Sequence, residues 1–164
     1  MGHTIPDNSI KMYGILEVFV KDQDGNLKRK YKFHNDIVSN IRTVDGVDVP
    51  NGTALITSML TNRVRQGIGT MRIGKGTTPT TDNTYELTTP VPGAFQALPV
   101  SNTTTQAIIQ FYTLDAQLPN DTYHEFGFFV GRNALFARVV NATGVEKVSG
   151  ENILWQYTVN VTKS

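Results

Sequence analysis

A glycine-rich stretch near the middle of the chain carries the first spacing that could do chemistry. Residues 69–76 read GTMRIGKG, in which two glycines separated by four residues precede Lys75. This is the spacing of a phosphate-binding loop, which also needs Ser or Thr directly after the lysine and a helix behind it. Gly76 stands after the lysine and the next segment contains Pro79. A strand that ends in a glycine turn is therefore the favoured interpretation, and no nucleotide site is expected.

A second candidate is the stretch Asp22-Gln23-Asp24-Gly25-Asn26, which places oxygen ligands at alternate positions as a calcium loop does. An EF-hand loop needs glycine at its sixth position and glutamate at its twelfth. Here Gly25 is fourth and Phe33 is twelfth. Since Asp, Asn and Gly tolerate positive φ, the same residues predict a β-hairpin turn, and no metal site is expected.

Acid–base chemistry would have to use three histidines and the carboxylates near them. His124 and Glu125 are adjacent, but neighbouring residues of a strand point to opposite faces and cannot act together. No recognised catalytic spacing is present. We therefore expect no catalytic residue, no cofactor and no enzymatic activity. The residues considered are His3, His34, His124, Asp36, Asp121 and Glu125.

The densest basic run, KRKYK at residues 28–32, encloses an aromatic residue and could lie against nucleic acid. On an extended chain Lys28, Lys30 and Lys32 share one face. Charges on an exposed strand also prevent edge-to-edge pairing, and this is the favoured interpretation. Nucleic acid is not expected as a partner.

Bulk properties exclude further classes. Fifteen basic and fourteen acidic residues give a formal charge of +1, and there is no cysteine. The N-terminus lacks the features of a secretory signal, and no apolar run approaches the roughly 20 residues of a membrane-spanning helix. We expect no membrane partner, and one domain over residues 1–164 with a flexible or partner-bound segment near residues 1–9.

The elements that must position these residues are mostly strands. Alternation of apolar and polar side chains predicts strands at residues 10–21, 27–33, 70–74, 104–114, 123–130, 134–140 and 152–162. The fold class we expect is all-β, an antiparallel β-sandwich or flattened barrel of about eight strands.

One segment has helical spacing instead. Apolar residues recur every three to four positions from Leu55 to Val64, which predicts one short α-helix near residues 53–66. Asn51 or Thr53 could cap its start. Arg63 and Arg65 would then lie in its last turn, and Gly67 would be its C-terminal left-handed residue.

Apolar residues on both faces of a strand suggest contact with another subunit. In EFGFFVG, Phe126 and Phe128 share one face and Phe129 lies on the other, and Ile15 and Phe19 give the first strand the same two-sided character. These five are our candidate subunit-interface residues. The alternative is a central strand covered on both faces within one protomer.

Several phrases occur in an order that resembles a group of small virion proteins of tailed bacteriophages, related to tail-fibre and baseplate components. They are VFVKDQDGNLKRKYKFHNDIVSN, TALITSMLTNRV, MRIGKGTTPTTDNTYEL, YHEFGFFVGRNALFARVV and ENILWQYTVNV, from about Leu16 to Val161. The usual glycine after the Ile-Val phrase is absent, and RTVDGVDVPNG looks like an extra piece before the helix.

The resemblance implies a β-rich structural subunit without a catalytic site. It would be assembled in the host bacterial cytoplasm and used in several copies in the virion, at the tail, baseplate, collar or fibre attachment region. Its partners would be copies of itself and neighbouring virion proteins. The alternatives are a capsid-surface decoration protein and a module that binds a host receptor or carbohydrate, in which Trp155 or an exposed tyrosine would stack on sugar.

Overall fold

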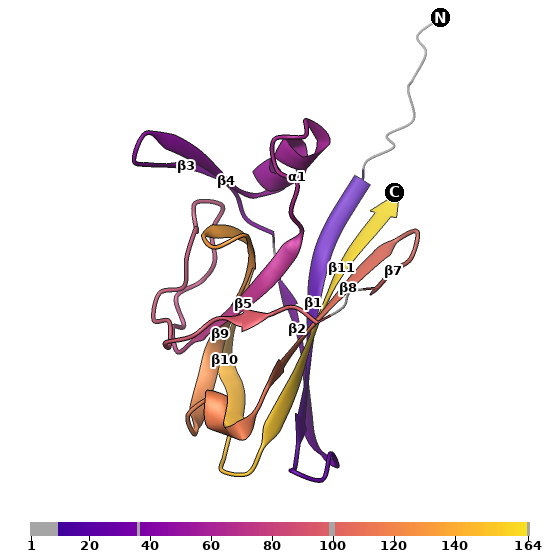
Figure 1. The fold of residues 1–164 in the computed structure, drawn as a ribbon, viewed down its shortest axis with the longest axis vertical. Helices are drawn as coiled ribbons and strands as arrows, with labels where there is room; N and C mark the ends of the chain where they lie inside the picture. Colours follow the sequence, from indigo (N-terminus) through magenta and orange to yellow (C-terminus); the bar gives the residue numbers. More distant parts are fainter. Residues whose placement is uncertain (1–9, 36, 99–100, 164) are drawn as a thin grey trace, which may run out of the picture.

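The chain folds mainly into antiparallel strands, as the alternating sequence predicts (Figure 1). The computed structural model describes residues 10–35, 37–98 and 101–163, and these form eleven strands, one α-helix and one short 3-10 helix. The expectation for residues 1–9 lies outside the described residues.

The first sheet has five strands in the order β2-β1-β11-β8-β7. Its long central pair is β1 and β11, antiparallel over their whole length, with Val18 opposite Trp155. The strands are β1 (Ile10–Lys21), β2 (Leu27–Asn35), β7 (Ser101–Asn102), β8 (Gln106–Thr113) and β11 (Asn152–Lys163). Between β1 and β2, Asp22 accepts hydrogen bonds from the Asp24 and Asn26 backbone amides, which confirms the predicted hairpin turn.

The second sheet has four strands in the order β10-β9-β5-β6. Its strands are β5 (Ile68–Gly74), β6 (Phe95–Gln96), β9 (Asp121–Val130) and β10 (Ala134–Lys147), and the 3-10 helix η1 (Asp115–Gln117) precedes β9. Among the described residues the two sheets stay separate, so the architecture is a sandwich and the barrel alternative is not realised.

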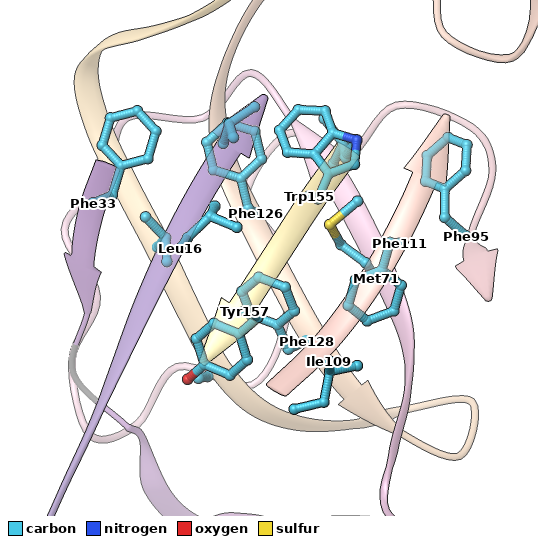
Figure 2. Packing of buried hydrophobic residues seen from close by; sticks show 14 of the residues in the cluster. Leu16, Phe33, Met71, Phe95, Ile109, Phe111, Phe126, Phe128, Trp155 and Tyr157 are labelled. Atoms are coloured by element: carbon cyan, nitrogen blue, oxygen red, sulfur yellow. The ribbon is translucent and has the colours of Figure 1, made fainter. Parts of the chain in front are cut away.

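Aromatic rings fill the space between the two sheets (Figure 2). Phe128 of β9 stacks on Tyr157 of β11, with ring centroids 3.9 Å apart, and Phe126 lies 5.2 Å from Trp155. The Trp155 indole donates a hydrogen bond to Thr113, so its polar N–H is satisfied inside the core.

A separate hairpin projects from this sandwich beside the helix (Figure 1). It consists of β3 (Ser39–Val44) and β4 (Val47–Gly52), and α1 (Thr53–Leu60) follows directly. Gly52 is the helix N-cap and no side chain caps it, so the predicted caps Asn51 and Thr53 are wrong.

The helix is shorter than the predicted 53–66. Asn62 takes the left-handed conformation, with φ 57, and the Arg63 amide donates to the Ser58 carbonyl, an arrangement that closes the last turn. Arg63 and Arg65 therefore lie beyond the helix, and Asn62 replaces Gly67 as the left-handed residue.

Candidate functional site

A buried ion pair lies on the face of the second sheet that is turned away from the first. Glu125 of β9 and Arg138 of β10 meet with a 2.6 Å contact between Arg138 Nη2 and Glu125 Oε2, and both side chains are almost completely buried. Neighbouring residues of these strands point the other way, into the aromatic core, because side chains alternate along a strand. The pair is therefore positioned by the same alternation that builds the core.

This ion pair fixes the long irregular segment of residues 75–94. The Glu125 carboxylate accepts hydrogen bonds from the backbone amides of Gly76, Thr88 and Thr89. Arg138 donates to the Thr78 carbonyl and to the Thr88 hydroxyl. One buried pair thus holds both ends of the segment against the sheet.

The electrostatics of the pair favour its ionised form. Burial acts to raise the pKa of Glu125, but the Arg138 guanidinium and the three backbone amides outweigh burial, so this pKa lies below its ordinary value. Because every oxygen of the carboxylate is engaged and its charge is neutralised, Glu125 is a structural anion, not a general acid or base.

The same cluster explains two of the glycines in GTMRIGKG, Gly74 and Gly76, whereas Gly69, the first glycine of the phosphate-loop spacing, has no close neighbour. A Cβ added at Gly74 or Gly76 would collide with the Glu125 carboxylate. The glycines therefore let a backbone turn approach an anion, and that anion is the protein's own carboxylate. Lys75 pairs instead with Asp121, and residues 75–94 contain no helix that could hold a phosphate.

The segment 75–94 also covers the back of strand β9. Leu87 is buried, and its Cδ2 atom lies so close to Gly127 that a Cβ added at Gly127 would collide with it. Phe129 lies beneath this covered face with Val38 and Leu135, and the Arg72 guanidinium sits 4.6 Å from its ring centroid.

These contacts correct the expectation for three candidate interface residues. Phe126 and Phe128 are fully buried between the sheets, and Phe129 is buried on the opposite side. The two-sided apolar character of β9 arises because the strand is covered on both faces within one protomer, so these phenylalanines are not available to a second subunit.

The other two candidates, Ile15 and Phe19, lie on the outer face of the five-stranded sheet and are half-buried. Phe19 lies under the Lys30 ammonium, 4.8 Å from the ring centroid, and Lys30 pairs with Glu17. This face therefore mixes apolar and polar side chains, and a subunit contact through Ile15 and Phe19 stays a prediction.

The structure also bears on the predicted basic strand, on metal binding, on membrane crossing and on sugar stacking. β2 is an edge strand, as expected for its lysines. The described residues contain no group of three or more His, Cys, Asp or Glu that could hold a metal ion. Nor does any helix described here reach the length and hydrophobicity that a membrane crossing requires. Trp155 is fully buried and cannot stack on a sugar.

The hairpin β3–β4 is the surface that the sequence reasoning missed. Its turn residues, Asp45 and Gly46, both have positive φ, which matches the right-handed twist of a two-residue hairpin. Val44 and Val47 flank this turn, paired across it, and are 37% and 65% exposed. An Asp-Gly pair between alternating residues predicts such a hairpin. This pair lies in RTVDGVDVPNG, the phrase described above only as an extra piece before the helix.

The base of the hairpin is fixed although its tip is exposed. Asn51 is completely buried, accepts a hydrogen bond from the Leu135 backbone amide and donates one to Asn40. Gly52 has φ 55, and a Cβ there would collide with the Val38 carbonyl. The hairpin therefore leaves the sandwich in a defined direction.

An apolar groove opens at the same end of the sandwich. It has a volume of about 380 Å³ and is lined by both sheets and by α1. Its apolar lining includes Met12, Ile56, Met59, Ala107, Phe136 and Val161. Among the described residues that line it, none has a charged side chain.

Comparison with protein-family models, with curated proteins and with solved structures found no match for this chain. Its class is therefore defined by the fold alone, as an antiparallel β-sandwich with one helix and one projecting hairpin.

Proposed function

We propose that this protein is a non-enzymatic structural component of a tailed-bacteriophage virion. It acts in several copies at the tail, baseplate, collar or fibre attachment region. The observation that carries the proposal is the hairpin β3–β4, which holds exposed apolar side chains away from a rigid sandwich. A two-stranded hairpin is marginally stable in water on its own, so its exposed apolar tip favours a role in contact with another molecule.

The internal rigidity of the sandwich supports the same proposal. The Glu125–Arg138 pair ties a long irregular segment to the sheet through backbone and side-chain hydrogen bonds. A subunit that is repeated in a particle needs one defined shape, and this network supplies it without creating an open reactive site.

The phrases that carry the resemblance meet in space at this network. Gly76 and Thr78 belong to the GKGTTPTTDNT phrase, Glu125 to HEFGFFVG, and Arg138 to LFARVV, and they are joined by hydrogen bonds. Phrases that seem unrelated along the chain thus serve one structural purpose, which supports reading their order as a shared architecture.

The test is to look for the chain in virus particles. Particles released from cells that produce the protein are purified on a density gradient, probed with an antibody against the recombinant chain, and imaged after gold labelling. We expect the chain in the particle band, in several copies, at a position on the tail or its attachment region. Complete, infectious particles that lack the chain would refute the proposal.

Labelling over the capsid shell instead would favour the alternative of a capsid-surface decoration protein.

A second measurement distinguishes the receptor-binding alternative from a structural role. The purified protein is screened on glycans, with exposed tyrosines such as Tyr85 and Tyr112 replaced by alanine in matched samples. Binding that is lost in one of these variants would favour a receptor role over a purely structural one.

A further inference from the structure

Two features at one end of the sandwich complement each other, and the same protomer carries both. The tip, residues 44–47 of the β3–β4 hairpin, exposes two valines, and the groove beside α1 exposes an apolar lining. We propose that the tip of one copy enters the groove of a second copy. This inference deepens the self-assembly in the proposed function, and it does not depend on the position of the protein in a virion.

The tip has the chemistry of an inserted element. Val44 and Val47 are paired across the turn, so their side chains lie next to each other on one face of the hairpin. Val47 is 65% exposed and Val44 is 37% exposed, whereas Asn51 at the base is completely buried. The exposed apolar surface of the hairpin therefore includes its tip, and it continues to Ile41 in the middle of β3, which is 64% exposed.

The groove has the chemistry of an acceptor. Its lining comes from Met12, Ile56, Met59, Ala107, Phe136 and Val161, and its volume is about 380 Å³. An apolar cavity of about 150 Å³ already holds a molecule the size of benzene, so two valine side chains fit this space. Methionines at two positions let the lining adapt to the inserted side chains.

The charges beside the two features have opposite signs. Asp45 and Asp48 lie in or next to the tip, and the one basic residue of the β3–β4 hairpin, Arg42, has its guanidinium over the Tyr85 ring, 4.5 Å from the centroid. Lys163 follows groove-lining Val161 by two residues on the same face of β11, and Arg65 precedes groove-lining Gly67 by two. Acidic residues around an apolar tip and basic residues around an apolar groove favour this pairing over tip against tip, which would bring like charges together.

The tip and the strands that line the groove lie on opposite sides of α1 in one molecule (Figure 1). In Figure 1 the hairpin projects to one side of α1, whereas β1, β8 and β11 lie on the other. A contact between unlike surfaces is heterologous, so each copy can bind one neighbour through its tip and another through its groove. Such contacts produce a ring where the rotation closes and a filament where it does not.

The absence of cysteine makes a site-specific test direct. Val47→Cys and Ala107→Cys place thiols at the tip and in the groove, both at exposed positions where folding is not at risk. The full chain is treated with a short bis-maleimide and separated on a denaturing gel. We expect a ladder of linked chains from the V47C/A107C double variant, and a linked dimer from a mixture of the two single variants.

The matched control is V148C/A107C, because Val148 is an exposed valine in the turn between β10 and β11. It should give no ladder. Linked dimers from V47C alone would mean tip against tip and would overturn the proposal. A link inside one chain in an Ile5→Cys, Ala107→Cys variant would mean that the protein's own N-terminal segment fills the groove, which would also overturn it.

Light scattering over a range of concentrations supplies an independent readout. V44D/V47D and A107W should each weaken association by about tenfold or more, since one buried valine contributes about that factor. V148D and Ala116→Trp, placed at exposed residues away from both features, should leave association unchanged. Opposite charges are tested by D48K and R65E, which should each weaken association and partly restore it when mixed.

Failure of this inference is distinct from failure of the proposed function. If the purified protein stays monomeric at every concentration, or associates equally well in the tip and groove variants, the inference is wrong. The virion proposal depends instead on whether the chain is found in particles.

Discussion

Two regions of the molecule differ in how far their side chains are covered. They are the back of β9 and the end that carries the hairpin and the groove. On the back of β9, an irregular segment is held by Glu125 and Arg138 until every polar group of the pair is engaged. At the open end, Val44 and Val47 of the hairpin stay exposed, and the groove beside α1 is open as far as residues 10–35, 37–98 and 101–163 are concerned. The first region completes the protomer, and the second offers surface to another molecule.

This difference indicates which substitutions should alter the stability of the protomer and which should alter its association. Changes to the covered region should alter the stability of the protomer, because its groups depend on one another. Changes to the open end should leave stability nearly unaltered and act on association. The following predictions test that division.

The largest effect is expected from Glu125→Leu. The change leaves the Arg138 guanidinium buried without its partner, which costs about 3 to 5 kcal/mol of unfolding free energy. Urea unfolding followed by tryptophan fluorescence measures it, because Trp155 is the single tryptophan and lies in the core. The double variant E125L/R138M should recover part of the loss, because it removes the unpaired buried charge but leaves the amides of Gly76, Thr88 and Thr89 without their acceptor. Equal stability of the two variants would show that the pair does not act as a unit.

A smaller loss is expected at the junction of hairpin and helix. Gly52→Ala adds a Cβ to a residue with φ 55 and drives it into the Val38 carbonyl, which should cost about 3 kcal/mol. Gly46→Ala is the matched control, since Gly46 also has positive φ but has nothing within 4 Å of the added Cβ. It should cost only about 1 kcal/mol. If both cost the same, backbone strain alone decides and the contact with Val38 is unimportant.

Acid should weaken the covered region before the open end. The folded-state pKa of Glu125 is lowered, so its stabilisation is complete above the unfolded-state pKa, about 4.3, and is lost as pH falls through the lower folded value. Urea midpoints between pH 7 and pH 3 should therefore fall more steeply for the wild type than for E125L/R138M. Parallel profiles would contradict this role of Glu125.

The smallest effect on stability is expected at the tip. Val44→Thr and Val47→Thr replace exposed side chains, so unfolding free energy should change by no more than about 0.5 kcal/mol. Urea unfolding of each variant and of the wild type, at a low protein concentration where association is minimal, measures this difference. A loss above 1 to 2 kcal/mol, on the order of a buried residue's contribution, would mean that the tip packs within its own protomer.

Much of the fold was predictable because its signals are local. The alternation from Ile10 to Lys21 predicts β1 with its observed bounds, and Asp24-Gly25 predicts the turn that follows. The antiparallel sandwich is confirmed by the structure. These features depend on neighbours two residues apart, which a single sequence displays.

The covered face of β9 was not predictable, because its partners are distant along the chain. Glu125 meets Gly76 across 49 residues, and residues 75–94 have no periodicity that would announce a packed segment. The sequence shows phenylalanines on both faces of β9 but not what covers either face, so they were predicted to form an interface. The hairpin tip could have been predicted, because Asp45-Gly46 is a local turn signal, but it was overlooked.

The two ends of the described chain run side by side, with Ile10 paired to Lys163 beside the groove. A peptide attached directly at Ile10 or Lys163 would therefore emerge next to the surface where we expect a neighbour to dock, and it would crowd that contact. The exposed turn at Asp24 and Gly25, at the far end of the β1–β2 hairpin, is the better position for a label or reporter (Figure 1).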